Sequence, residues 1–193
     1  MALHFARLSK MLRFARPPAS ARVLDMGCGW GLTTEFFGML GCKVTAIDIN
    51  ASFVELVMER NKRLGYDVQA FQSAFDDVNV SGEFDLIVFY ECLHHAVKPW
   101  EVISRLAPRL APGGCLAFVG EPVNTFWWPH WGVRLDPISV YCIRKFGWFE
   151  SGWSADFISE CMTRAGLEVR IQHDSDSVIG PVFVGSRAPA PAP

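Results

Sequence analysis

The residues best suited to hold a ligand are three glycines in the stretch VLDMGCGWG, residues 23–31. Gly27, Gly29 and Gly31 occupy alternate positions, and Asp25 precedes them. Glycine lets a turn close tightly and lets a ligand approach the backbone. A helix that begins just after the glycines offers unpaired N–H groups to an anion. An ordinary strand–turn–helix connection needs only one or two glycines, so we expect a ligand-binding loop.

A second acid, Asp48, ends the apolar stretch in VTAIDIN. At the end of a strand it is suited to hold both hydroxyls of a ribose. The dinucleotide fingerprint is G-x-G-x-x-G, whereas the third glycine here comes one residue early. Together these features predict a ligand that contains adenosine but does not require the pyrophosphate-binding site of a dinucleotide.

Groups that can move a proton follow two later apolar stretches. FDLIVFYECLHH, residues 84–95, ends in Glu91, His94 and His95, and Glu121 follows CLAFVG. Histidine titrates near neutral pH and is the natural general base. We expect His95 first, then His94 or Glu121, in that role; the alternative is that both histidines only shape the pocket. Together with His130 these groups could also surround a metal, but no ligand spacing supports that, and we expect none.

Residues 121–153 form a long stretch without clear periodicity, which is typical of a functional loop. The stretch carries five of the seven tryptophans. We expect a substrate lid; the alternative is an aromatic packing cluster over the end of the sheet. The expected substrate contacts are Trp128, His130, Trp131 and Arg134.

Apolar strands alternate with amphipathic helices around these motifs. This predicts an α/β fold with a mostly parallel sheet and helices on both faces. Two closing strands with no helix between them should pair antiparallel. The expected strands are residues 21–26, 42–49, 66–71, 84–90, 115–120, 167–174 and 177–186, and the expected helices are 32–41, 52–65, 99–111 (bent or interrupted at Pro108) and 154–166. The basic, amphipathic residues 1–18 should form a helix packed on the domain, with a membrane-surface role as the alternative.

Composition fits a single globular domain. Of 193 residues, 50% are hydrophobic and 20% are charged, with a net charge of -2. We expect one domain over residues 1–187, followed by a Pro/Ala tail, 188–193, that could tether another domain. No apolar run approaches the ~20 residues of a membrane span, and no basic cluster suggests nucleic-acid binding. Six cysteines without C-x-x-C spacing favour a reducing, cytoplasmic location.

The segments VLDMGCGWG, VTAIDIN, FDLIVFYECLHH and RLAPGGCLAFV together resemble the class I S-adenosylmethionine-dependent methyltransferases, over roughly residues 20–120. The resemblance implies a Rossmann-like doubly wound sheet of order 3-2-1-4-5-7-6, with strand 7 antiparallel, and S-adenosyl-L-methionine as cofactor.

The same resemblance assigns roles to single residues. The backbone around Gly27 and Gly29 would hold the methionine moiety of the cofactor. Asp25 would engage its amino end, Asp48 its ribose and Ile49 its adenine. Family members often place an Asp after the third strand for the adenine amine, but QSAFDDV puts Ala74 there. Phe75 and Asp76 would serve in its place. Gly31 and Glu91 would complete the cofactor site.

A less specific similarity concerns the acceptor. The string WGVRLDP…SVYCIRKFGW is similar to bacterial methyltransferases associated with surface-polysaccharide synthesis. It implies O-methylation of a sugar or glycoconjugate. Two alternatives stay open. One is a small-molecule methyltransferase with an aromatic, lipid or amine acceptor. The other is a non-catalytic cofactor-binding module of a larger protein.

Overall fold

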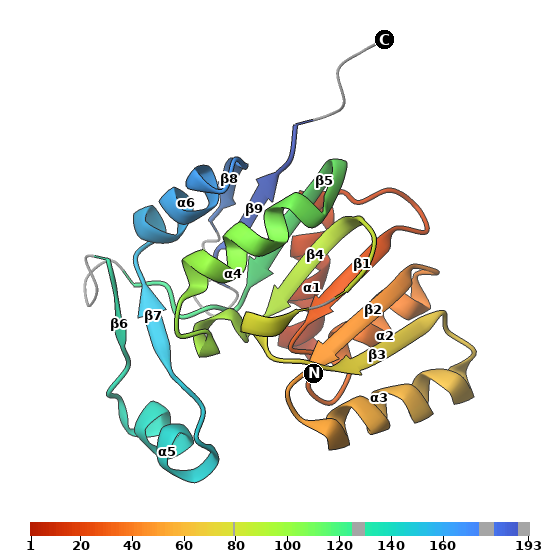
Figure 1. Cartoon of the computed structure of the whole chain (residues 1–193), viewed down its shortest axis with the longest axis horizontal. Helices are drawn as coiled ribbons and strands as arrows, with labels where there is room; N and C mark the ends of the chain where they lie inside the picture. The colour runs from red at the N-terminus through yellow and green to blue at the C-terminus, as the bar shows by residue number, and fades with distance from the viewer. Residues whose placement is uncertain (79, 125–129, 174–179, 189–193) are drawn as a thin grey trace.

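A seven-stranded sheet forms the centre of the protein (Figure 1). The computed structural model describes residues 1–78, 80–124, 130–173 and 180–188, and all structural statements concern these residues. In spatial order the strands are β3 (Val68–Gln72), β2 (Lys43–Asp48), β1 (Arg22–Met26), β4 (Phe84–Tyr90), β5 (Leu110–Val119), β9 (Val182–Ser186) and β8 (Glu168–Gln172).

The direction of the strands confirms the expected topology. β3, β2, β1, β4 and β5 run parallel, whereas β9 pairs antiparallel with both β5 and β8. The chain moves outward from β1 to β2 and β3, then returns to β4 on the other side of β1. Strand order therefore reverses between β1 and β4, and a ligand is expected beyond their carboxyl ends.

Helices cover both faces of the sheet, as predicted (Figure 1). On one face α1 (Ala2–Ala15), α2 (Leu32–Met39) and α3 (Ala51–Leu64) bury Met11, Phe37 and Val57. On the other face lie α4 (Pro99–Leu106) and α6 (Ala155–Arg164). Because successive strand residues point to opposite faces, β4 sends Val88 toward α1 and Phe89 toward α4.

The N-terminal segment forms the helix expected for residues 1–18. The buried side chains of α1 are Leu8, Met11 and Ala15, which lie against β5 and β9. The helix is therefore packed on the domain. Among the described residues no helix is long and apolar enough to cross a membrane.

The helix expected over 99–111 is interrupted around Pro108, one of the two predicted outcomes. It ends at Leu106, a 3-10 turn follows at Ala107–Arg109, and β5 begins at Leu110. Proline has no N–H to donate and its ring clashes with the preceding turn. Pro108 therefore ends the helix rather than bending it.

Within the stretch 121–153, residues 131–153 are not irregular, which corrects our expectation for this part. They contain β6 (Trp131–Val133), α5 (Pro137–Phe146) and β7 (Ser151–Trp153), with β6 and β7 paired antiparallel. Asp136 caps α5 by accepting hydrogen bonds from Ser139, and Gly147 ends the helix with a φ of 72°. We call residues 131–153 the arm, because they extend away from the sheet (Figure 1). Trp127, Trp128 and residues 189–193 of the tail lie outside the described residues.

Candidate functional site

The three glycines form the turn between β1 and α2. Gly27 has a φ of 69°, and a Cβ there would lie 3.1 Å from the sulfur of Cys92 and 3.2 Å from the ring of Phe75. Gly29 has a φ of 50°, yet a Cβ there would meet no atom within 4 Å. Positive φ favours glycine, and the open space beside Gly29 leaves its backbone accessible. The loop is therefore shaped for close approach of a ligand.

Asp48 closes this loop from the end of β2. One carboxylate oxygen accepts a hydrogen bond from the N–H of Gly29 (2.8 Å), and the other accepts from the N–H of Asn50 (2.8 Å). Each oxygen keeps a second lone pair, so the carboxylate can still accept two hydroxyls. The next residue, Ile49, is 67% exposed, which suits an apolar contact with a flat ring.

Asp25 lies beneath the loop and is only 1% exposed. The hydroxyl of Thr34 donates to it at 2.6 Å. Burial raises the pKa of Asp25 to about 7, although the Thr34 hydrogen bond opposes that shift. Burial destabilises the ionised form of this carboxyl, and a positively charged group bound beside it would stabilise that form. Thr34 was not anticipated from sequence, because a threonine inside a helix carries no signal of its partner.

Glu91 lies at the end of β4 in the left-handed conformation, with a φ of 52°. Its carboxylate pairs with Arg7 of α1, and the ring of His4 lies 3.8 Å away. Gly120 makes room for it, since a Cβ at 120 would lie 2.4 Å from Cγ of Glu91. The expected cofactor residue thus also anchors α1 at the edge of the site.

Phe75 and Asp76, the two residues expected to contact the cofactor after the third strand, have different surroundings. Phe75 is half-buried beside Gly27 and makes an edge contact with Phe89, with ring centroids 5.6 Å apart. Asp76 is exposed, and its printed contact is through its backbone carbonyl, which accepts a hydrogen bond from Arg105. The structure brings Phe75 to the glycine loop and leaves the carboxylate of Asp76 outside these contacts.

Glu121 is a buried carboxylate at the end of β5. It accepts hydrogen bonds from the backbone N–H groups of Cys92, Leu93 and His94 at 3.0–3.1 Å, and from Nδ1 of His94 at 2.8 Å. Burial raises its pKa, but His94 and these N–H donors outweigh burial, and the net pKa is lowered. A carboxylate held ionised with four donors is a poor general base.

Of the two histidines after β4, His95 has one ring nitrogen, Nε2, for which the described residues provide no hydrogen-bond partner. Its Nδ1 lies 2.9 Å from the carbonyl oxygen of Phe149. A carbonyl only accepts, so Nδ1 carries the proton and Nε2 presents a lone pair. Burial, followed by the neighbouring His94, lowers the pKa of His95. The ring of Trp148 lies beside it, with centroids 5.3 Å apart.

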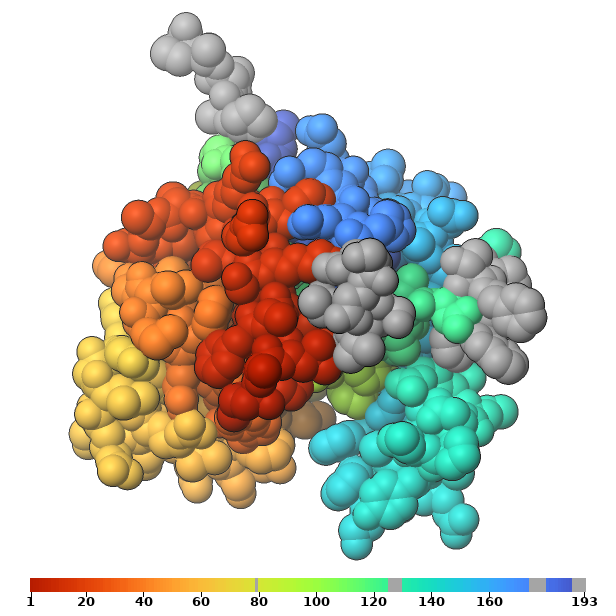
Figure 2. All heavy atoms as spheres, turned by 180° about the vertical axis from the view of Figure 1, so that it is seen from behind, coloured from red at the N-terminus to blue at the C-terminus, as the bar shows by residue number. Residues whose placement is uncertain are grey.

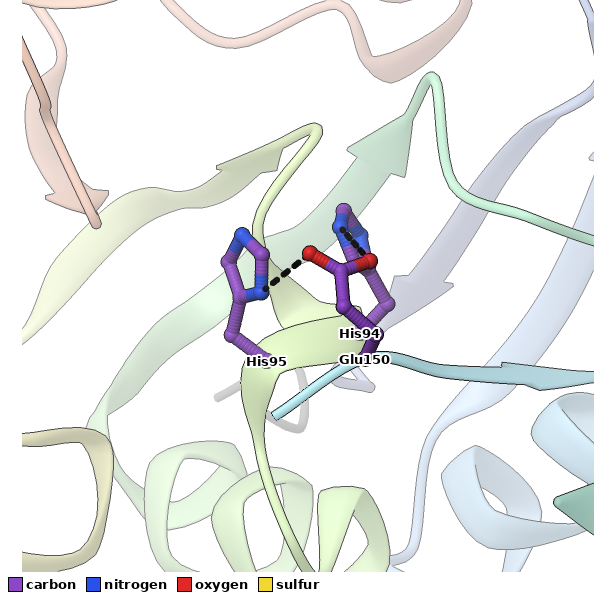
Figure 3. A group of neighbouring side chains, drawn as sticks. All are labelled: His94, His95 and Glu150. Carbon is purple, nitrogen blue, oxygen red and sulfur yellow. Dashed lines mark ion pairs between the residues drawn. The ribbon is translucent and has the colours of Figure 1, made fainter. Parts of the chain in front are cut away.

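Glu150 joins both histidines and was not anticipated from sequence (Figure 3). Its carboxylate lies 3.7 Å from Nε2 of His94 and 3.6 Å from Nδ1 of His95. These three side chains form a candidate metal cluster among the described residues. Arg134 already pairs with Glu150 at 3.3 Å, and Phe149 already takes the Nδ1 proton of His95. Both contacts favour an ion-pair network over a cation, so the expectation of no metal stays a prediction.

The described residues expected to contact substrate are His130, Trp131 and Arg134, and all three lie in or beside the arm. His130 is exposed, and its carbonyl accepts from the N–H of Ser154. Trp131 packs against the rings of Trp100 and Phe149. Arg134 pairs with Asp136 at 3.2 Å as well as with Glu150. Trp128 lies outside the described residues. Among the described tryptophans, Trp148 is the one whose ring lies beside His95.

The residues around the glycine loop fit S-adenosylmethionine. Three features of this site lie at adjacent strand ends. The backbone at Gly29 is open, the carboxylate of Asp48 can accept both ribose hydroxyls, and the buried acid Asp25 suits a cationic amino group. A family model described as a methyltransferase domain matches residues 3–172. The chain belongs to this methyltransferase family. Its cofactor is S-adenosylmethionine, as in methyltransferases of the same fold.

Curated relatives of the methyltransferase cover about half of it. A ubiquinone biosynthesis O-methyltransferase of Xanthomonas axonopodis pv. citri is 38% identical over 101 residues, which are 51% of this chain and 42% of the relative. The chain thus spans about two fifths of the length of such relatives.

Solved structures resemble the methyltransferase over nearly its whole length. An S-adenosylmethionine-dependent methyltransferase of Mesorhizobium loti has a TM-score of 0.75 at 14% identity, and the match covers 96% of this chain and 98% of that one. The 1,6-didemethyltoxoflavin-N1-methyltransferase of Burkholderia thailandensis, solved with S-adenosylhomocysteine, has a TM-score of 0.73 at 17% identity, covering 97% and 79%. At these identities the similarity establishes the fold.

The role of Asp48 predicts a selective loss of cofactor affinity. Asp48→Ala should weaken S-adenosylmethionine binding by about 1–3 kcal/mol, because the ribose hydroxyls would lose their acceptor. Calorimetry measures this directly. Asp67→Ala, at an exposed acid before β3, is the matched control and should bind normally. Equal affinities of the two variants would remove Asp48 from the site.

The raised pKa of Asp25 predicts that cofactor affinity depends on pH. Binding of a cationic amino group favours the ionised carboxylate, so affinity should gain from ionisation of Asp25 as pH rises through about 7. Asp25→Asn cannot ionise and should lack this gain. The cofactor's own amino group titrates with a pKa of about 8. Because this titration affects both proteins equally, the pH curve of the Asn variant is the reference from which the contribution of Asp25 is measured. Parallel pH curves for the two proteins would contradict this role.

Proposed function

We propose that this methyltransferase methylates a hydroxyl group of an aromatic acceptor, with His95 as the general base. The observation that carries the proposal is the hydrogen bond from Nδ1 of His95 to the carbonyl of Phe149. It orients the ring and fixes the proton on Nδ1, so Nε2 is the basic nitrogen. His95 comes from a 3-10 turn, Leu93–His95, that follows the end of β4 after two intervening residues.

The chemistry asked of the chain is removal of one proton. When bound, the cofactor supplies an electrophilic methyl group on a sulfonium. As the acceptor oxygen gains the methyl group, its proton passes to Nε2 of His95. Because burial lowers the pKa of His95, the ring is neutral and able to accept that proton at neutral pH. The half-buried setting of His95 also limits competing water.

The surroundings of His95 favour a flat acceptor. Trp148 lies beside His95, and Phe146 stacks on Trp148 with centroids 4.6 Å apart. Aromatic faces favour rings at such distances. The relatives named ubiquinone biosynthesis O-methyltransferases support oxygen as the acceptor atom and a quinone-related ring as the acceptor class.

A saccharide is the second candidate, because a tryptophan face also suits the C–H face of a sugar. The basic residues that could bind a phosphate or carboxylate on such an acceptor are Arg134, Arg144 and Lys145. The guanidinium of Arg134 is paired with Glu150 and Asp136, whereas Arg144 and Lys145 are exposed. A cytoplasmic location is part of the proposal, since all six cysteines are free.

Release of S-adenosylhomocysteine tests the proposal. The purified chain should turn over with catechols or other phenols, and more slowly or not at all with nucleotide sugars, oligosaccharides and fatty acids. Turnover with sugars alone would establish the saccharide alternative. Cofactor binding without turnover on any acceptor would instead indicate a non-catalytic module.

A second experiment addresses the base. His95→Ala should lower turnover by ~10²-fold or more while cofactor affinity stays intact. In the parent, kcat/KM should fall as pH drops through the lowered pKa of His95, below its usual value of about 6.5, because the base becomes protonated. His173→Ala, at an exposed histidine, is the control. Turnover of His95→Ala within threefold of the control would assign the proton to another group.

Two tryptophans separate acceptor binding from packing. Trp148→Ala should raise the acceptor KM several-fold and spare the cofactor, because a stacking face is worth about 0.5–1.5 kcal/mol. Trp131→Ala removes a ring packed on Trp100 and Phe149, so it should lower the melting temperature and impair both ligands together. A Trp148→Ala variant that behaves like Trp131→Ala would reduce Trp148 to a packing residue.

A further inference from the structure

The arm carries an unusual share of exposed apolar side chains. Leu135 is 77% exposed and Ile138 is 73% exposed. Large exposed apolar residues scattered singly are ordinary, whereas a contiguous group marks an interaction surface. The group, called here the arm patch, consists of Val133, Leu135, Ile138, Tyr141, Phe146 and Trp148.

Half of the arm patch lies on α5, a helix that the described part of the chain leaves largely exposed. The one buried residue of α5 is Ser139, a small polar side chain. Ile138 and Tyr141 are three residues apart and share a helical face, so this face turns its apolar side chains to solvent. Figure 2 shows the arm as a lobe that stands beside the body of the molecule.

Two cations border the arm patch. Arg144 and Lys145 are exposed in the last turn of α5, and no ion pair joins either to a described residue. The other charged groups of the arm already have partners, because Arg134 pairs with Asp136 and Glu150. The exposed face of α5 is therefore apolar, aromatic and positively charged.

We propose that the arm patch docks on an anionic phospholipid surface. An amphipathic helix with apolar and aromatic residues on one side and basic residues beside them binds in the plane of a bilayer interface. Tyr141 and Trp148 have the amphipathic rings that lie at headgroup level. Arg144 and Lys145 complement the negative charge of the lipid headgroups.

A second copy of the chain fits the arm patch less well. In a two-fold dimer the same surface meets itself, so the two cations on each copy would face a surface of the same charge. Such like-charge contact opposes association. Charge complementarity therefore favours the lipid surface.

The docked arm would also connect the bilayer to the active site. Tyr141 contacts Phe146, Phe146 stacks on Trp148, and Trp148 lies beside His95, with ring centroids 4.6–6.0 Å apart. An apolar aromatic acceptor dissolved in the membrane would follow this row of rings to His95. This last step rests on the proposed function, whereas docking itself does not.

Vesicle co-sedimentation of the full chain tests docking. The protein should sediment with vesicles of phosphatidylcholine mixed with phosphatidylglycerol and stay in solution with phosphatidylcholine alone. The double substitution Arg144→Gln/Lys145→Gln should lower partitioning about 30-fold, given the attraction of each basic residue to such a surface. Ile138→Ser/Tyr141→Ser should lower it about tenfold or more through lost apolar burial.

Matched controls come from α3, which also has exposed leucines and two cations in its last turn. Lys62→Gln/Arg63→Gln and Leu56→Ser/Leu64→Ser should sediment like the parent, and melting curves should establish that each variant is folded. Failure of the parent to bind anionic vesicles would overturn the proposal, as would equal losses in the α3 controls. A parent dimer that arm-patch variants convert to monomer, without vesicle binding, would assign the surface to a second copy. The assay contains neither cofactor nor acceptor, so its outcome is independent of the proposed reaction.

Discussion

The site depends on the buried carboxylate of Glu121. A charge removed from water is tolerated only when it is fully paired, and Glu121 meets this condition with three backbone N–H groups and the ring of His94. Those donors are the residues that follow β4, whereas Glu121 follows β5. The carboxylate therefore ties two strand ends together and sets the direction in which the chain leaves β4. His95 owes its position at the edge of the sheet to that constraint.

A second set of contacts continues from the sheet into the arm. The hydroxyl of Ser151 donates to the carbonyl of His94 at 2.8 Å, and the carbonyl of Phe149 accepts from His95. Glu150, between them in sequence, faces both histidine rings. The protonation pattern of His95 is thus determined by backbone atoms at the base of the arm. The proposed proton transfer to His95 would consequently depend on how the arm is held against the sheet.

The fold and the turn expected to bind the cofactor were predictable, because they depend on local patterns. Apolar runs alternating with helices fix the parallel sheet, and glycines at alternate positions indicate the turn between β1 and α2 that Asp48 closes. The helix of the arm also had local signals in the sequence: Asp136 as the N-cap, Pro137 in the first turn and Gly147 as the stop. These signals were overlooked because the many aromatic residues of the stretch suggested an irregular loop. Glu150 and Arg7 could not be predicted, because their partners are distant in the sequence and no local period relates them.

The crowding between Glu91 and Gly120 constrains how this family can diversify. A methyl group at position 120 would occupy the space of the Glu91 side chain, so position 120 cannot gain a side chain while Glu91 keeps this position. Homologues that acquire a side chain at 120 should carry a small residue at 91, and they would then lose the anion that holds Arg7. The two strand ends and the N-terminal helix should therefore covary as one evolutionary unit. Substitutions within that unit would pass through unstable intermediates unless the changes at 120, 91 and 7 occur in a compatible order.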